Sequence, residues 1–159
     1  MKNESEQFHR RCGEILRMAL GVEFALEFFI FKYFCMDQAD KEYLLHKFVL
    51  NRLGFESKIK IFEEICKGEE IEPEKFRKIS KSANFVRETR NRVAHYEAVS
   101  DQKKGIRLRK GVIFEKDELK LTKELIEEVD KERLSVIQGM TKIHLGLIER
   151  SRESPNVKE

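Results

Sequence analysis

Apolar residues recur along most of the chain at intervals of three and four, the spacing that places side chains on one face of an α-helix. The pattern predicts five helices, over about residues 5–36, 39–52, 56–67, 73–95 and 122–147. Gly54 and Gly68 stand where the second and third helices would stop, and Pro73 stands in the first turn of the fourth. We therefore expect an all-α fold, an up-and-down helical bundle of about five helices.

One segment has a different pattern. Residues 105–121, GIRLRKGVIFEKDELKL, alternate apolar residues with charged ones. This predicts a small β-hairpin inserted before the last helix, with turn residues at Lys110-Gly111 and Lys116-Asp117. Because we see no internal repeat and no domain boundary, we expect residues 1–159 to form one domain, with 151–159 as a frayed tail.

The first predicted helix is apolar on nearly all sides between Met18 and Met36. A membrane span is not expected, because Glu23, Glu27 and Lys32 interrupt the stretch. One small domain can cover only one face of such a helix. The other face therefore predicts a homodimer formed through the helix around Met18–Met36.

Composition narrows the class of protein. The chain has 159 residues, about one domain, and a net charge of only +3, so binding of a polyanion would need a local basic patch. Its three cysteines, Cys12, Cys35 and Cys66, have no CxxC spacing. That argues against a disulfide scaffold or a zinc knuckle and fits a reducing cytosol. The polar opening, MKNESEQFHRR, does not look like a signal peptide, so we expect a cytoplasmic protein.

An arginine falls on the inward face of the fourth predicted helix. This stripe consists of Phe76, Ile79, Ala83, Val86, Arg90 and Val93, and all of them except Arg90 are apolar. An unpaired guanidinium in a core costs several kcal/mol. Two interpretations remain: either Arg90 pairs with a buried acid, with Glu23 and Glu27 as candidates, or the face opens at Arg90 into a cleft that binds an anion.

His95 follows Arg90 by five residues. In a continuous helix this is about 140° around the axis, so the two side chains would not share a face. They would converge if the helix ends or loosens near Ala94, or if the partner is Arg90 of a second subunit. The alternative is that His95 only caps the end of the helix, where the helix dipole favours a cation.

The run Arg90-Asn91-Arg92-Val93-Ala94-His95 resembles the Arg-polar-x-x-x-His signature of HEPN domains. The resemblance implies a compact helical bundle that dimerises, and an endoribonuclease that needs no metal or other cofactor and acts in toxin–antitoxin or antiviral systems. It also implies a cognate antitoxin as a partner. The likeness in architecture covers residues 5–96 and 122–150. Tyr96 directly follows the histidine, whereas one group of HEPN toxins has a tyrosine two residues after it.

The residue types fit this chemistry. Metal-independent cleavage of RNA requires a proton to be taken from a 2′-hydroxyl and another to be given to the leaving 5′-oxygen, and histidine titrates near neutrality. Arginine presents a planar fork of donors to phosphate oxygens. We therefore predict Arg90 and His95 as catalytic residues, with Asn91 orienting the histidine or holding a phosphate oxygen.

A basic run surrounds the motif and extends into the predicted hairpin. Residues expected to contact RNA are Arg87, Arg92, Tyr96, Lys103, Lys104, Arg107 and Arg109. The alternative is an ordinary solvated face. No set of residues with metal-ligand spacing is present. Two other functions stay open: a non-catalytic HEPN-like adaptor or nucleotide-binding module, and a plain helical scaffold in which Arg90 is salt-bridged.

Overall fold

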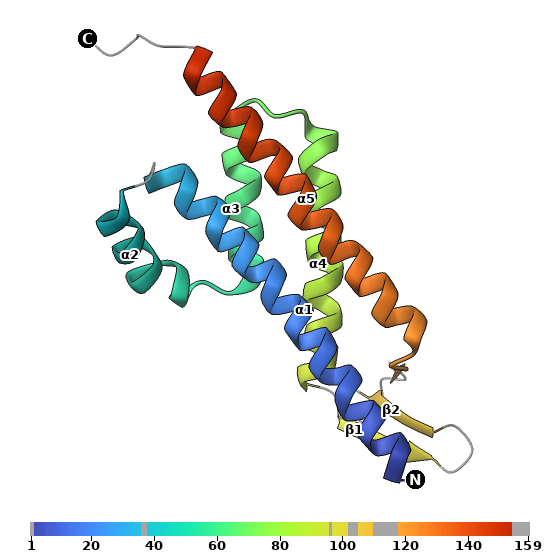
Figure 1. The fold of residues 1–159 in the computed structure, drawn as a ribbon. Helices are drawn as coiled ribbons and strands as arrows, with labels where there is room; N and C mark the ends of the chain where they lie inside the picture. Colours follow the sequence, from blue (N-terminus) through green and yellow to red (C-terminus); the bar gives the residue numbers. More distant parts are fainter. Residues whose placement is uncertain (1, 36–37, 96, 102–104, 110–117, 154–159) are drawn as a thin grey trace.

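The computed structural model describes residues 2–35, 38–95, 97–101, 105–109 and 118–153. This part of the chain contains five packed α-helices and one short 3₁₀ helix, so the predicted helical bundle is confirmed. The elements are α1 (Lys2–Cys35), α2 (Ala39–Phe48), η1 (Leu50–Arg52), α3 (Phe55–Gly68), α4 (Pro73–His95) and α5 (Lys123–Glu153). Consecutive α-helices alternate in direction (Figure 1).

Four of the helices enclose the core. Helices α1, α3, α4 and α5 each contribute side chains that are almost fully buried, among them Val22, Leu26, Phe62, Val86 and Val136. Helix α2 contributes no buried residue, and it lies on the outside of α1 (Figure 1). The three- and four-residue spacing of the apolar side chains explains why four helices suffice: each turns one stripe toward the common centre.

Three short strands lie at the end of the bundle that holds the N-terminus (Figure 1). They are β1 (Glu97–Asp101), β2 (Gly105–Arg109) and β3 (Glu118–Leu119), and they pair antiparallel in that order. The sequence pattern covers the last two but not β1, whose five residues, EAVSD, hold only two apolar side chains. The predicted turns at Lys110-Gly111 and Lys116-Asp117 lie outside the described residues.

Two predicted helices end differently in the structure. The second predicted helix is divided, with α2 ending at Phe48 and η1 following. Helix α5 continues to Glu153, three residues into the segment expected to be a frayed tail, and residues 154–159 lie outside the described part. At the start of α5, the Thr122 hydroxyl accepts a hydrogen bond from the Leu125 N–H at 3.2 Å, an N-terminal cap that fixes where the helix begins.

Candidate anion-binding site

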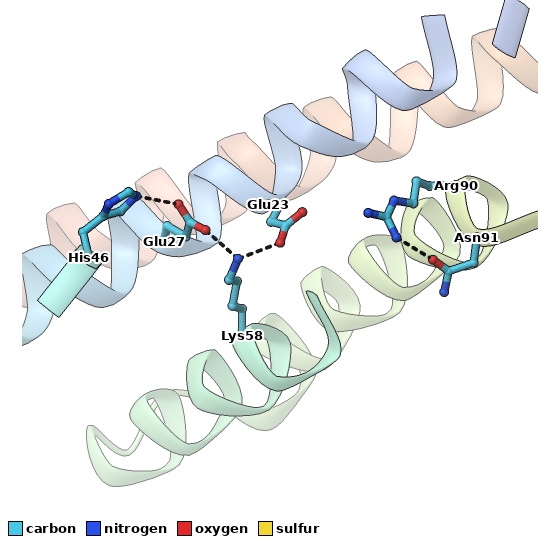
Figure 2. Close-up of polar contacts among 6 residues, drawn as sticks. All are labelled: Glu23, Glu27, His46, Lys58, Arg90 and Asn91. Carbon is cyan, nitrogen blue, oxygen red and sulfur yellow. Dashed lines mark hydrogen bonds and ion pairs between the residues drawn. The ribbon is translucent and has the colours of Figure 1, made fainter. Parts of the chain in front are cut away.

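Arg90 lies on the inward side of α4, as its spacing predicts. The five apolar residues of the stripe are all buried, whereas Arg90 itself is half-buried. Figure 2 shows its guanidinium extending from α4 beside α1, in the direction of Glu23. Arg90 therefore interrupts the buried apolar stripe of α4 with a planar cation that is partly exposed.

The two acids predicted as partners of Arg90 bind a different cation. Lys58 Nζ lies 2.6 Å from Glu23 Oε1 and 2.5 Å from Glu27 Oε1 (Figure 2). Within the described ranges, no carboxylate lies at ion-pair distance from Arg90. The interpretation that Glu23 or Glu27 seals Arg90 inside the protein is therefore wrong.

Asn91 holds the guanidinium instead. Arg90 Nη1 donates a hydrogen bond to Asn91 Oδ1 at 2.9 Å. A neutral amide leaves the positive charge of Arg90 in place, and the remaining donors of the fork are directed away from Asn91. In this structure Asn91 thus orients the arginine, a task that the sequence did not suggest for it.

His95 is the last residue of α4 and its side chain is exposed. Helix α4 runs unbroken from Pro73 to His95, so the helix does not loosen near Ala94. Arg90 and His95 therefore remain about 140° apart around one helix axis. Of the two ways in which we expected these side chains to converge, only the one that uses a second subunit is compatible with an intact α4.

Lys58 is buried, with 3% of its surface exposed. Burial by itself lowers the pKa of Lys58, but the hydrogen bonds and negative charges of Glu23 and Glu27 outweigh it, so the pKa lies above its ordinary value of 10.5. His46 on α2 adds a further contact, with Nε2 3.4 Å from Glu27 Oε2. The lysine is therefore charged at neutral pH and joins α3 to α1.

Sequence reasoning missed Lys58, although a signal was present. Phe55, Lys58, Phe62 and Ile65 follow the three- and four-residue spacing of the inward face of α3. The same test that singled out Arg90 would have marked Lys58 as a second cation on an apolar stripe. Because both Lys58 and Arg90 lie on inward stripes, the spacing alone does not show which of them the acids of α1 bind.

The predicted RNA-binding residues are placed only in part. Arg87 is already engaged, since its Nη1 lies 3.2 Å from Glu56 Oε2 and its Nε donates to Asn84 Oδ1 at 3.1 Å. Arg92 is half-buried on α4. For Arg107 and Arg109 the structure describes only the backbone, which belongs to strand β2. The other candidates, Tyr96, Lys103 and Lys104, lie outside the described residues.

Two hollows lie elsewhere on the described surface. The larger, of about 1260 Å³, runs between α4 and α5 past Ile79, Ile143 and Lys142, and neither Arg90 nor His95 lines it. The smaller, of about 430 Å³, is lined by Leu20, Glu23, Phe24, Glu27, Asn51, Leu53 and Lys58. The smaller hollow is thus lined both by Lys58 with its two acids and by Leu20 and Phe24, which lie on the outer face of α1.

That outer face of α1 is apolar and exposed. Leu16, Leu20, Phe24 and Phe28 follow at intervals of four, and their exposed fractions are 36%, 62%, 64% and 41%. The prediction that one bundle leaves part of this helix uncovered thus agrees with the exposure of these side chains. Whether a second copy covers them stays a prediction.

Neither a metal centre nor a membrane segment is found where the chain is described. No group of three or more His, Cys, Asp or Glu side chains could hold a metal ion among these residues. No helix in the same ranges is long and apolar enough to cross a membrane. What the geometry provides is a half-buried arginine held by an amide, beside acids that are bound to another cation.

Comparison of the chain with protein-family models, with curated proteins and with solved structures finds no match.

Proposed function

We propose that this protein is a metal-independent endoribonuclease of HEPN type, which cleaves RNA in a composite cleft of a homodimer. The observation that carries the proposal is the state of Arg90: half-buried, oriented by Asn91 at 2.9 Å, and not paired with a carboxylate within the described residues. A guanidinium held in this way keeps its charge and its donors for an anion. The phosphodiester of RNA is the anion that the motif Arg90–His95 favours.

A second protomer supplies what one chain lacks. Arg90 and His95 lie on different sides of α4, so one protomer would contribute Arg90 and its partner would contribute His95. The exposed side chains of Leu16, Leu20, Phe24 and Phe28 present an apolar area on the order of 400 Å². That is within the range of about 300–600 Å² of the largest apolar patch on a typical monomer, which is often functional, and is about half of what each partner buries in a standard interface. The Arg90 side chain extends beside the same helix (Figure 2), so a dimer through α1 would place it near the interface.

The chemistry would proceed as an in-line displacement. His95 takes the proton of the 2′-hydroxyl, the 2′-oxygen forms a bond to phosphorus, and the bond to the 5′-oxygen breaks. A water molecule gives a proton to that leaving oxygen, so each cleft needs one Arg90 and one His95. Arg90 binds the non-bridging oxygens, where negative charge accumulates in the transition state. The products are a 2′,3′-cyclic phosphate and a 5′-hydroxyl.

The direct test is incubation of the purified protein with single-stranded RNA in EDTA. We expect cleavage by the wild type and a loss of about 10²-fold or more with Arg90→Ala or His95→Ala. Arg77→Ala, an exposed position on the same helix, and His9→Ala, an exposed histidine on α1, are matched controls that should cleave normally. Cleavage that survives either of the first two substitutions would remove the proposal.

Mixing the two inactive variants tests the composite cleft. In a mixed dimer of Arg90→Ala and His95→Ala protomers, one cleft that pairs Arg90 of one chain with His95 of the other is intact. Re-equilibrated mixtures should therefore recover about a quarter of the wild-type rate, because half of the dimers are mixed and each has one intact cleft of two. If both groups acted from the same chain, mixing would restore nothing.

A non-catalytic anion-binding module is the second candidate. The continuous α4 favours it, because a single chain does not bring His95 onto the face of Arg90. In that case the wild type would bind RNA or a nucleotide through Arg90 without cleaving it. Binding of a labelled RNA that depends on Arg90 but not on His95, with no cleavage in EDTA or in Mg²⁺, would favour the adaptor.

A further inference from the structure

Arg90 and Lys58 stand on either side of one carboxylate. Lys58 Nζ lies 2.6 Å from Glu23 Oε1, and Figure 2 shows the Glu23 carboxylate on the side of Lys58 that faces Arg90. Glu27 lies farther from Arg90, beyond Lys58 along α1 (Figure 2). Of the two acids, Glu23 is therefore the one with access to either cation.

Because Glu23 is bound to Lys58, it does not neutralise the positive charge of Arg90. Side-chain exposure is 4% for Lys58 and 20% for Glu23, so this pair lies in a less polarisable region than the surface. A carboxylate at that depth that loses its cation gains strongly from turning toward another one. Arg90 is then the cation on the side that Glu23 faces, and Asn91, its present partner, is neutral.

We propose that Lys58 is a positioning residue, which keeps Arg90 able to bind an anion by holding Glu23 and Glu27 away from it. The proposal rests on the proposed function, because it assumes that Arg90 binds a phosphate. Lys58 itself would not touch the RNA. Its effect would pass through Glu23, which would otherwise close over the guanidinium and compete with the phosphate.

The chain offers a matched pair of variants that separates this role from a structural one. Lys58→Met/Glu27→Gln removes the lysine and leaves Glu23 as a free acid. Lys58→Met/Glu23→Gln removes the lysine and leaves Glu27, which keeps its contact with His46. Both variants lose the same buried cation and one carboxylate charge, so any general loss of packing or stability is shared. The acid that remains is Glu23 in the first variant and Glu27 in the second, and of these two Glu23 is the one that faces Arg90 (Figure 2).

The experiment measures binding of a fluorescein-labelled 2′-O-methyl RNA, which lacks the attacking hydroxyl and so reports binding without cleavage. We expect Lys58→Met/Glu27→Gln to bind about tenfold more weakly than wild type or worse, the effect of losing one charge-assisted contact. Lys58→Met/Glu23→Gln should bind like wild type. The triple variant Lys58→Met/Glu23→Gln/Glu27→Gln should recover the lost affinity, because no acid is left to cover Arg90.

Arg90→Ala keeps the two proposals distinguishable. If Arg90→Ala weakens binding and the matched pair does not differ, the role of Lys58 is overturned while the anion site stands. If Arg90→Ala binds as well as wild type, the anion site fails and the role of Lys58 fails with it. Equal weakening in both members of the pair and in the triple variant would show that Lys58 acts only through stability.

Discussion

Gly139 of α5 lies against Ile79 of α4 with no room for a side chain between the two helices. A Cβ atom at Gly139 would stand 2.6 Å from Ile79 Cγ1 and 2.7 Å from Ile79 Cδ1. Ile79 is itself buried, with 5% of its surface exposed, and belongs to the same inward stripe as Arg90. Gly139 therefore lets α5 approach Ile79 of α4 more closely than a residue with a side chain would.

Gly139→Ala should destabilise the protein. Overpacking a core contact typically costs about 1–3 kcal/mol, which exceeds the gain of about 1 kcal/mol in helix propensity. Gly146, on the same helix, has open space around it and is the matched control, since Gly146→Ala should raise the free energy of unfolding by about the propensity term. Urea titration followed by circular dichroism measures both. Equal effects of the two substitutions would contradict the close contact.

Glu70 adopts a left-handed backbone conformation, with φ of 53°, directly after Glu69, the C-cap of α3. The Ile71 N–H donates to the Cys66 carbonyl at 2.8 Å and the Glu70 N–H to the Lys67 carbonyl at 3.1 Å, the two bonds of a Schellman motif. This position favours glycine, so Glu70→Gly should stabilise the protein by about 1 kcal/mol. Thermal unfolding measures the change. Glu70→Ala is the control, because it removes the same charge but keeps the Cβ, and it should give no such gain.

A feature can be predicted from the sequence when neighbours in the chain determine it. A feature that depends on side chains from other helices cannot be predicted in this way. The bounds of α4, Pro73–His95, match the prediction because a proline and a regular apolar spacing define them locally. The inward position of Arg90 follows from the same periodicity. Its partner does not, because helical spacing tells which face a residue occupies but not which side chain lies opposite.

Two features of the candidate site can be found only in the structure and not in the sequence. Lys58 stands on an inward stripe as visibly as Arg90, but only the packing of α3 against α1 shows that it reaches Glu23 and Glu27 first. Asn91 is adjacent to Arg90 in sequence, yet its hydrogen bond to the guanidinium depends on the rotamers of both side chains. Strand β1 is missed for a simpler reason, since a strand of five residues with two apolar side chains has no detectable period.

Phe24→Glu should convert the proposed dimer into a monomer. Phe24 is 64% exposed in the middle of the apolar face of α1, and a charge there would stay unpaired in a dimer that buries this face. Sedimentation velocity over a range of concentrations measures the association. Leu145→Glu is the control, because Leu145 is a comparably exposed apolar residue that belongs to α5 and not to this face of α1. If the composite cleft is correct, RNA cleavage falls together with the dimer, and a monomeric variant that still cleaves would contradict it.

Cys66 makes the stability depend on pH in the alkaline range. Burial, followed by the charge of Glu63, raises the pKa of the Cys66 thiol from 9.0 to about 12. Between these values the folded protein keeps the proton and the unfolded chain releases it, so the free energy of unfolding falls as pH rises above 9.0. At about pH 10 the loss is on the order of 1 kcal/mol, and well below the unfolded pKa it vanishes.

Cys66→Ala should therefore flatten this dependence. The variant is less stable than wild type near neutral pH because it leaves a small cavity, but the difference should shrink from pH 8 to about pH 10 as the wild type loses its thiol term. Burial also raises the pKa of Cys12, and that contribution is common to both proteins, so it cancels in the comparison. Lys58, whose pKa lies above 10.5, keeps its proton over this range. Urea titrations at each pH measure the difference, and parallel curves would show that the Cys66 thiol ionises as readily in the folded protein as in the unfolded chain.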